Sequence, residues 1–300
     1  MKAAVLPAVD AAFELRDVAD PAGEALIRVR AAGVNFADVL IRRGRYPQMP
    51  ELPVVLGSEV AGELADGTRV MAMTGMGGYA ELVVADASQV VPLPERASFA
   101  EGAAFLLTFL TAYIPLTRQV RLRPGGTVLV HAAAGGVGSA AVQVARALGG
   151  RVVAAVGSPE KLEVCRQLGA DEAYVYDELP EGLRCDVVVD PVGGELFAAA
   201  LRRLRTIGTL VAIGFAGGPW PELSPAELVG RNIGVQGFYL GRLLRHDPEL
   251  VREALGEVVA LWETGALQPL VGAEVALADV DRAHELVESR QSVGKVVLIP

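Results

Sequence analysis

Residues 128–138 read Val-Leu-Val-His-Ala-Ala-Ala-Gly-Gly-Val-Gly, a valine-rich run that ends in closely spaced glycines. A short apolar run of this kind is typical of a buried parallel strand, and the glycines let the backbone turn sharply after it. An alanine-rich helical segment follows at 139–148 and is ended by Gly149 and Gly150. Because free backbone N–H groups and the helix dipole both point at such a turn, the stretch predicts a cradle for the phosphates of a dinucleotide.

The composition limits the class of protein. The chain has 300 residues, for which two domains are the natural expectation. A hydrophobic content of 52% with 21% charged residues supplies material for a packed core and argues against disorder. The net charge of −9 disfavours nucleic acid as a partner, since phosphate backbones bind basic surfaces.

No feature of the sequence predicts export or membrane insertion. The N-terminus lacks the long apolar segment of a signal peptide. The most apolar run, at 99–116, contains Glu101 and Pro115 and is short and interrupted for a span of about 20 residues, so it predicts a buried helix. The two cysteines, Cys165 and Cys185, provide no disulfide framework and are interpreted as buried structural thiols. We therefore expect a cytoplasmic protein with no membrane partner.

The first hundred residues are predicted to form an irregular β-barrel. Short apolar runs are separated there by many glycines and prolines, and no long helical period occurs before Phe99. These runs lie at 25–31, 54–56, 69–73, 80–84 and 90–91.

The remainder of the chain alternates between strands and helices. Ser98 and Glu101 form a capping-box pattern at the start of a helix. This alternation predicts a doubly wound parallel sheet in an α/β domain. Strands are expected at 128–131, 151–156, 186–190, 208–213 and 232–236, and helices at 139–148, 195–204 and 248–264. A β-like tail with a short helix at 280–288 is expected to rejoin the first domain, which gives a dinucleotide-binding domain at 101–263 and a discontinuous domain at 1–100 and 264–300.

The glycine pattern itself departs from the usual dinucleotide fingerprint. It aligns as Ala133-x-Gly135-x-x-Gly138, with alanine in place of the first glycine. Its position after a strand and before a helix is the context that the fingerprint requires. We therefore predict that the turn binds the cofactor through Ala134, Gly135, Gly136, Val137 and Gly138. The alternative is a tight strand–helix turn that binds no nucleotide.

The end of the second strand favours NADPH over NADH. An NAD site usually places Asp or Glu about 20 residues after the first strand, where it binds the ribose hydroxyls. Here the strand is followed by Gly157 and Ser158, and Lys161 brings a positive charge into the next helix. A cation at a helix N-terminus suits a 2′-phosphate. Glu160 counts against this interpretation, and the alternative is an ordinary surface lysine.

Five stretches resemble one known family. They are 132–138 (Ala-Ala-Ala-Gly-Gly-Val-Gly), 33–38 (Gly-Val-Asn-Phe-Ala-Asp), 56–62 (Leu-Gly-Ser-Glu-Val-Ala-Gly), 77–81 (Gly-Gly-Tyr-Ala-Glu) and 294–297 (Gly-Lys-Val-Val). The sequence is similar to the zinc-independent, zeta-crystallin-like quinone oxidoreductases of the medium-chain dehydrogenase/reductase superfamily. The resemblance implies a GroES-like catalytic β-barrel domain and a Rossmann domain, with the active site in the cleft between them. It further implies a homodimer that transfers hydride from NADPH to quinones or α,β-unsaturated carbonyls.

The same resemblance predicts that no metal is bound. Zinc-dependent members of the superfamily have a cysteine ligand where this chain has Asn35 and a histidine ligand where it has Ser58. Neither an amide nor a hydroxyl is a good zinc ligand. The cysteines of a structural zinc lobe are absent too, since none precedes Cys165.

The predicted catalytic residues are Asn35, Asp38 and Tyr46, which the resemblance places near the nicotinamide and in the substrate pocket. An Asn amide can donate a hydrogen bond to a carbonyl, and a phenol can donate a hydrogen bond or a proton. The alternative for Asn35 and Asp38 is structural, because such residues often pin loops.

The resemblance also supplies further cofactor residues. Lys161, Tyr176 and Arg290 are expected at the 2′-phosphate, and a guanidinium suits a phosphate because it can bind it with two hydrogen bonds. Phe238 lies in a late strand region, 232–239, which in relatives contributes to the dimer contact and to the edge of the nicotinamide pocket.

The histidines have no metal-ligand spacing. His131 is interpreted as a hydrogen-bonded histidine near the core, whereas His246 and His284 are expected at the surface. Two other functions stay open: an enoyl-thioester reductase with a longer pocket, and a protein that binds NADPH without turning it over.

Overall fold

The computed structural model describes all 300 residues and divides them into two compact units. Unit 1 contains Met1–Leu107 and Pro269–Pro300, and unit 2 contains Thr108–Gln268. The domain limits expected from the sequence fell after residues 100 and 263. Each unit has its own sheet system and its own hydrophobic core.

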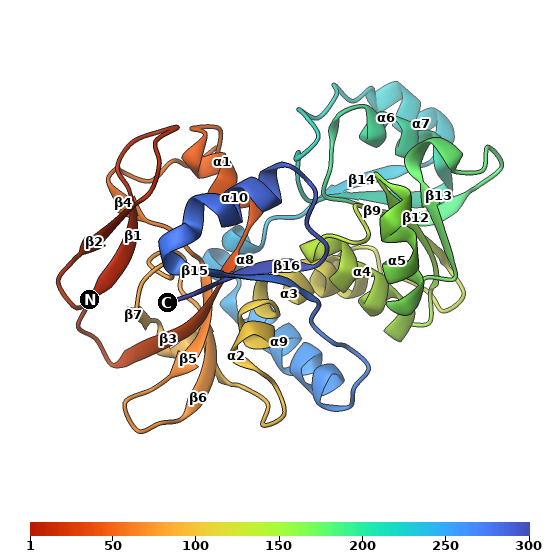
Figure 1. The fold of residues 1–300 in the computed structure, drawn as a ribbon. Coiled ribbons are helices and arrows are strands. Elements are labelled where there is room, and N and C mark those ends of the chain that lie inside the picture. Colours follow the sequence, from red (N-terminus) through yellow and green to blue (C-terminus); the bar gives the residue numbers. More distant parts are fainter. The chain divides into compact units, whose positions relative to one another are not determined.

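Unit 2 is built on a six-stranded parallel sheet (Figure 1). Its strands are β9 (Thr127–His131), β10 (Arg151–Val156), β11 (Glu172–Val175), β12 (Cys185–Asp190), β13 (Leu204–Ala212) and β14 (Gly234–Gly237). They lie in the order β11-β10-β9-β12-β13-β14, and every neighbouring pair is parallel. In chain order this is 3-2-1-4-5-6, the strand order of a Rossmann fold. The predicted doubly wound sheet is confirmed.

The strand order decides where a ligand can bind in unit 2. In an open parallel sheet, the crevice at the carboxyl ends of the strands opens where the strand order reverses, which is here between β9 and β12. These two strands pair directly, with Val128 opposite Val187 and Leu129 opposite Val188. All five residues of β9 are buried, so the residues that follow it are held on a rigid support.

Helices and single turns connect the strands of unit 2. They are α3 (Leu106–Ile114, which starts in unit 1), α4 (Gly136–Ala147), α5 (Leu162–Gln167), α6 (Gly194–Arg203), α7 (Pro225–Arg231), α8 (Leu240–His246) and α9 (Pro248–Glu263), with a π-helical turn at Pro115–Gln119 and 3₁₀ turns at Pro159–Lys161 and Tyr176–Glu178. A cluster of fully buried side chains, among them Leu129, Val153 and Phe197, joins the sheet to α6. Burying each such side chain contributes about 1.5–3 kcal/mol.

Unit 1 contains two sheets. A three-stranded antiparallel sheet has the order β2-β1-β4, and a seven-stranded sheet has the order β15-β16-β3-β5-β6-β8, with β7 also paired to β3. Their strands are β1 (Lys2–Leu6), β2 (Glu14–Asp17), β3 (Ala25–Val34), β4 (Val54–Val55), β5 (Glu59–Glu63), β6 (Arg69–Met73), β7 (Leu82–Ala85), β8 (Val90–Pro92), β15 (Val271–Ala276) and β16 (Lys295–Ile299). Figure 1 shows the blue tail strand β16 beside β3, and the two pair antiparallel. The tail therefore rejoins the sheet of the first hundred residues.

The helices of unit 1 agree only in part with those expected from the sequence. They are α1 (Phe36–Arg42), α2 (Phe99–Ala103) and α10 (Val280–Glu288), with 3₁₀ turns at Ala87–Gln89 and Leu277–Asp279. The capping box of Ser98 and Glu101 is present at the start of α2. The apolar run at 99–116 is not one helix, because α2 ends at Ala103 and α3 begins at Leu106. Helix α1 was not expected, since its seven residues are too few to show a helical period.

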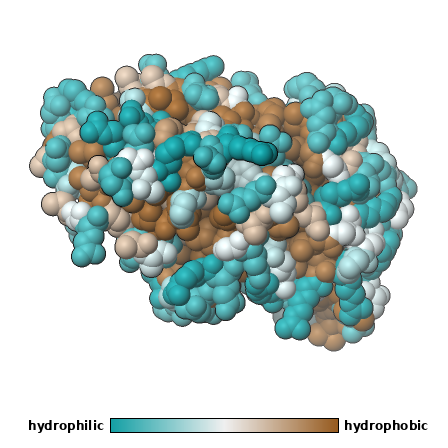
Figure 2. Space-filling model, turned by 90° about the horizontal axis from the view of Figure 1, so that it is seen from below, coloured by the Kyte–Doolittle hydropathy of each residue, from teal (hydrophilic) through white to brown (hydrophobic).

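The surface carries scattered apolar residues. Figure 2 shows hydrophobic side chains among hydrophilic ones on one face of the molecule. No helix is long and apolar enough to cross a membrane.

Candidate functional site

The glycine turn follows β9 and opens helix α4. Gly135 is the N-cap of α4, and Ala132 has a positive φ of 48°. A Cβ on Gly138 would lie 2.0 Å from the carbonyl oxygen of Ala132, so a side chain cannot fit there. The predicted residues Ala134, Gly135, Gly136, Val137 and Gly138 thus form a tight turn at the helix N-terminus. The N–H of Gly135 closes this turn on the carbonyl oxygen of Ala132 at 2.8 Å.

The end of β10 carries no carboxylate, as the sequence indicated. Ser158 is the N-cap of the turn Pro159–Lys161, but its side chain makes no capping hydrogen bond. Its hydroxyl instead bonds to Glu160 and lowers the pKa of that carboxyl group. Burial lowers the pKa of Lys161, whose side chain is therefore partly withdrawn from water. A Cβ added at Gly157 would meet nothing closer than the Tyr176 ring, at 3.8 Å.

Tyr176 lies beside the glycine turn. Its hydroxyl accepts a hydrogen bond from the N–H of Ala132 at 3.0 Å. Its ring meets the ring of His131 edge-on, with 5.7 Å between the centroids. The structure therefore brings the predicted residue Tyr176 to the turn and to the end of β10 at once.

His131 is buried, as predicted, and its Nδ1 lies 3.1 Å from Oδ1 of Asp190. Asp190 is fully buried and also accepts hydrogen bonds from the N–H groups of Val192 and Gly193. Sequence reasoning did not single out Asp190. Its signal was present: an acidic residue ends a valine-rich strand and is followed directly by a Pro-Val-Gly-Gly turn.

A second cluster of polar side chains lies inside unit 1. Lys295 places Nζ 2.6 Å from Oε1 of Glu59 and 2.5 Å from Oδ1 of Asn35. Asn35 in turn directs Nδ2 toward the same Glu59 oxygen at 3.2 Å. The other Glu59 oxygen accepts the N–H of Leu107 at 3.0 Å. All three residues are buried, at 4% exposure of the whole residue for Lys295, 0% for Glu59 and 7% for Asn35.

Asp38 extends this cluster along α1. It accepts the N–H of Asn35 at 2.8 Å and the hydroxyl of Tyr79 at 2.9 Å. Burial raises the pKa of Asp38 to about 6, and the hydrogen bonds from Asn35 and Tyr79 oppose that rise. Sequence reasoning missed Glu59, Tyr79 and Lys295 as members, although each lies in a stretch that carried the family resemblance.

The remaining predicted residues lie on three other segments of the chain. Tyr46 is half-buried against the core of unit 1. Arg290 follows α10 in unit 1 and is exposed, with a positive φ of 59°. Phe238 follows β14 in unit 2 and lines a cavity of about 560 Å³. The other lining residues include Trp220, Tyr239, Arg242 and His246.

The histidine and cysteine expectations had mixed outcomes. His246 is exposed, as expected. The prediction for His284 is wrong: its side chain is fully buried, between the rings of Phe13 and Tyr79. Cys165 and Cys185 are buried thiols, as predicted, and burial raises the pKa of each to about 11.

The donor set does not fit zinc where the superfamily would bind it. The amide of Asn35 is engaged with Lys295 and Glu59, and Ser58 offers only a hydroxyl. No cluster of three or more His, Cys, Asp or Glu side chains could hold a metal ion.

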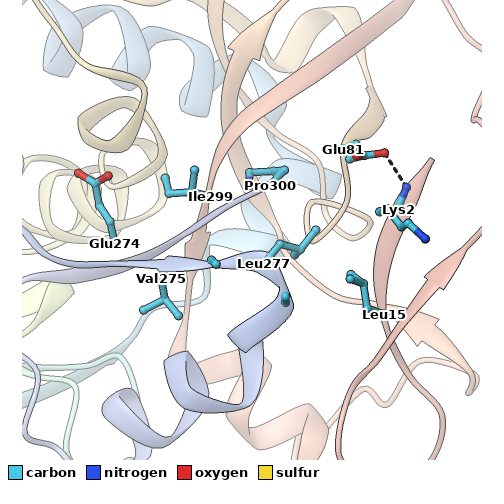
Figure 3. Close-up of a pocket in the computed structure, with 10 residues that line it drawn as sticks. Lys2, Leu15, Glu81, Glu274, Val275, Leu277, Ile299 and Pro300 are labelled. Carbon is cyan, nitrogen blue, oxygen red and sulfur yellow. Dashed lines mark hydrogen bonds between the residues drawn. The ribbon is translucent and has the colours of Figure 1, made fainter.

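A further cavity of about 430 Å³ lies in unit 1 but contains none of the predicted residues (Figure 3). Two of its charged residues are engaged: the N–H of Lys2 donates to Glu81 at 2.6 Å, and the Lys2 ammonium pairs with Asp17. The third, Glu274, is exposed on β15. The rest of its lining is mostly apolar, including Leu15, Val275 and Ile299.

Two family descriptions match the sequence. Residues 21–95 match the alcohol dehydrogenase GroES-like domain, and residues 136–259 match the family described as zinc-binding dehydrogenase. A protein of Pseudomonas aeruginosa named quinone oxidoreductase is 36% identical over 305 residues, covering 92% of this chain and 91% of that protein.

Solved structures are similar over the full length. The quinone oxidoreductase of Thermus thermophilus, described with its NADPH complex, is 42% identical with a TM-score of 0.93, and all of both chains is covered. A mycobacterial structure complexed with NADPH is 34% identical with a TM-score of 0.91, again over all of both chains.

Proposed function

We infer that this chain, which belongs to the quinone oxidoreductase family of the medium-chain dehydrogenase/reductase superfamily, is an oxidoreductase that uses NADPH. The observation that carries this proposal is the glycine turn at the switch point of a 3-2-1-4-5-6 sheet, next to a β10 end without a carboxylate. A site of this form holds phosphates on backbone N–H groups and does not favour the ribose hydroxyls of NADH. The NADPH complexes of similar chains support the same cofactor.

We assign the cofactor's phosphates to three sets of groups. The N–H groups of the turn at 134–138 receive the pyrophosphate. Lys161 and Tyr176 receive the 2′-phosphate, with Gly157 leaving room for it. Arg290 is proposed as a further phosphate ligand. Phe238 is proposed to bound the nicotinamide end, since it lines a cavity at the ends of β13 and β14.

We propose a quinone or an α,β-unsaturated carbonyl as the hydride acceptor. NADPH supplies the hydride when bound. The acceptor's oxygen gains negative charge as it is reduced, so the protein's contribution is a hydrogen-bond donor placed at that oxygen.

The geometry of Asn35 suits this donor role. Because Lys295 occupies Oδ1, the amide orientation is fixed with Nδ2 as the donor end. One Nδ2 hydrogen serves Glu59 at 3.2 Å, while Gly33 O lies at the 3.5 Å limit of a hydrogen bond. We propose that the second hydrogen is offered to the substrate carbonyl. Asp38 then holds the backbone of Asn35, and the Tyr46 phenol is the proposed source of the proton that completes the reduction.

The reaction is proposed to need no metal. The place of the superfamily's zinc ligands is taken here by Asn35 and Ser58, and Asn35 is already bound to a resident ammonium group. Chelators are therefore expected to leave turnover unchanged.

A homodimer through the edge of the unit 2 sheet is proposed as well. β14 is an edge strand, and an uncovered edge presents unpaired backbone groups to a second chain. Five of the eight exposed large hydrophobic residues lie in unit 2 on segments near β13 and β14: Ile207 at 85%, Val229 at 76%, Trp220 and Tyr239 at 45%, and Leu223 at 41%. Exposed apolar side chains of this kind suit a twofold interface between two copies of the chain.

The test is oxidation of NADPH with a panel of acceptors: 1,4-benzoquinone, 9,10-phenanthrenequinone and a crotonyl thioester, each also with NADH. We expect turnover of the quinones with NADPH. Preference for the thioester over both quinones would make the chain an enoyl-thioester reductase. Tight NADPH binding with no turnover of any acceptor would contradict the enzymatic proposal.

A further inference from the structure

Three side chains form a continuous contact along the carboxyl edge of the unit 2 sheet. Asp190 ends β12, His131 ends β9 and Tyr176 directly follows β11. Asp190 is joined to His131 by a 3.1 Å contact, and His131 is joined to Tyr176 through their rings. The sequence separations are 59 and 45 residues, so only the strand order brings the three together.

Asp190, at one end of these three side chains, fixes the orientation of the His131 imidazole. An ionised carboxylate can only accept hydrogen bonds, and Asp190 already accepts those of Val192 and Gly193. The group that faces it on His131 must therefore be Nδ1–H, which sets the tautomer and holds the ring in one plane. Because both side chains are at most 2% exposed, water does not compete for this bond.

Tyr176 contacts the imidazole ring of His131, whose orientation Asp190 fixes. The two rings stand at 85° with centroids 5.7 Å apart, the edge-to-face arrangement that aromatic pairs favour. The Tyr176 hydroxyl is bound from the other side by the N–H of Ala132. Tyr176 itself is the first residue of a 3₁₀ turn that follows β11, and its ring also packs against the hydrophobic core of unit 2.

We propose that Asp190 and His131 are positioning residues that hold Tyr176 beside the glycine turn and so set the preference for a 2′-phosphate over a ribose hydroxyl. This proposal rests on NADPH being the cofactor. His131 acts through Tyr176 and touches no reacting atom. The contact of Tyr176 with the 2′-phosphate exists in NADPH alone, so loosening Tyr176 weakens NADPH and leaves NADH nearly unaffected.

The test variant is His131→Asn. Asparagine keeps an N–H donor near the place of Nδ1, so Asp190 retains a partner, while the ring that supports Tyr176 is removed. Dissociation constants for NADPH and NADH are measured by calorimetry, together with the unfolding midpoint. We expect NADPH to bind roughly tenfold more weakly, which corresponds to about 1.4 kcal/mol, and NADH to change by less than about twofold.

A double-mutant cycle separates positioning from general damage. Tyr176→Phe is expected to lower the NADPH/NADH preference at least as much as His131→Asn, and in the Tyr176→Phe background the second substitution should change the preference no further. The matched control is Tyr174→Phe, which removes a hydroxyl two residues earlier in β11, where it bonds Glu172. This control is expected to keep the wild-type preference.

The outcomes distinguish this inference from the proposed function. Wild-type protein that binds NADH as tightly as NADPH would contradict the assignment of the cofactor itself. Two results would contradict the positioning role while leaving the cofactor assignment intact in a wild type that prefers NADPH. One is that His131→Asn weakens the binding of NADPH and NADH equally. The other is that it lowers the NADPH/NADH preference as much in the Tyr176→Phe background as in the wild type. An unchanged NADPH/NADH preference in Tyr176→Phe would also contradict the positioning role, and this result does not depend on whether His131→Asn folds.

Discussion

Lys295 Nζ lies 2.6 Å from Glu59 Oε1, an ion pair that joins the last strand, β16, to β5 inside unit 1. Both side chains are buried, at 5% and 0% exposure. Asn35 is hydrogen-bonded to both residues of the ion pair. The pair therefore fixes the side chain that we propose as the hydrogen-bond donor to the substrate oxygen. The stability of unit 1 and the orientation of its proposed donor therefore depend on the same two charges.

Lys295→Met is expected to destabilise the protein strongly. It leaves the Glu59 carboxylate buried without its cation, and breaking such a pair costs about 3–5 kcal/mol. Lys295→Met combined with Glu59→Gln removes both charges and should recover most of that loss. Urea unfolding of the two variants measures the difference. A single variant as stable as the double variant would show that the pair is not buried as described.

The double variant also tests the donor role of Asn35. It is expected to bind NADPH as the wild type does but to lose kcat for quinones, because nothing then fixes which end of the Asn35 amide faces the substrate. Wild-type kcat in a folded double variant would contradict the role assigned to Asn35.

His284 is expected to make the protein sensitive to acid. Both of its ring nitrogens are buried without a hydrogen-bond partner, and burial lowers its pKa to about 3. Repulsion by Arg42 and Arg43 contributes to this lowering of the pKa, and Glu288 opposes it. Since an unfolded histidine has a pKa of about 6.5, the unfolded chain binds the proton more readily, and His284 costs stability as the pH falls from about 6.5 toward 3.

The measurement is the free energy of unfolding between pH 7.5 and 4.5 for wild type and His284→Leu. Asp38 titrates in the opposite sense. Its folded pKa of about 6 lies above the ordinary value of 3.8 for an aspartate, so its contribution to stability is lost as the pH rises through 6. The difference between wild type and variant isolates His284. This difference should grow in favour of leucine as the pH falls. A difference that stays constant with pH would mean that His284 is accessible in the folded state.

The proposed dimer is tested by placing charges on its apolar surface. Ile207→Lys combined with Val229→Lys changes two side chains that are 85% and 76% exposed in the single chain, so the fold of unit 2 should be retained. Sedimentation velocity should show a dimer for the wild type and a monomer for the variant, with similar melting temperatures. Wild-type protein that sediments as a monomer would exclude the dimer.

The features that could be predicted best from the sequence are the helices, strands and turns that depend on residues close together in the chain. The strand β10 and the helix α10 have the bounds expected for them, because their hydrophobic patterns and stop signals are local. The turn at 132–138 was recognised for the same reason. Its relation to Asp190 was not, since that contact requires β9 and β12 to be neighbours in the sheet.

The least predictable features are long-range contacts between polar residues. Lys295 meets Glu59 across 236 positions, and no periodicity of either strand marks them as partners. His284 was expected at the surface because histidine is often exposed, whereas its place on the inner face of α10 against Phe13 is decided by how the tail packs on unit 1. Helix α1 begins at the residue after Asn35, whose N–H is bound by Asp38, and a single helical turn with tertiary support has no sequence period to detect.

The most direct test of the central claim is the ratio of kcat/KM for NADPH to that for NADH, measured with 9,10-phenanthrenequinone in wild type, Lys161→Ala and Lys2→Ala. Losing a charge-assisted contact costs about 1.5–3 kcal/mol, so Lys161→Ala should lower the ratio by roughly ten- to a hundredfold. Lys2, whose ammonium pairs with Asp17 and which is not among the proposed cofactor residues, serves as the control and should keep the wild-type ratio. We predict a wild-type ratio well above one that falls only in Lys161→Ala. A wild-type ratio of one or less, or no oxidation of either cofactor, would contradict the assignment of this chain as an NADPH-dependent quinone reductase.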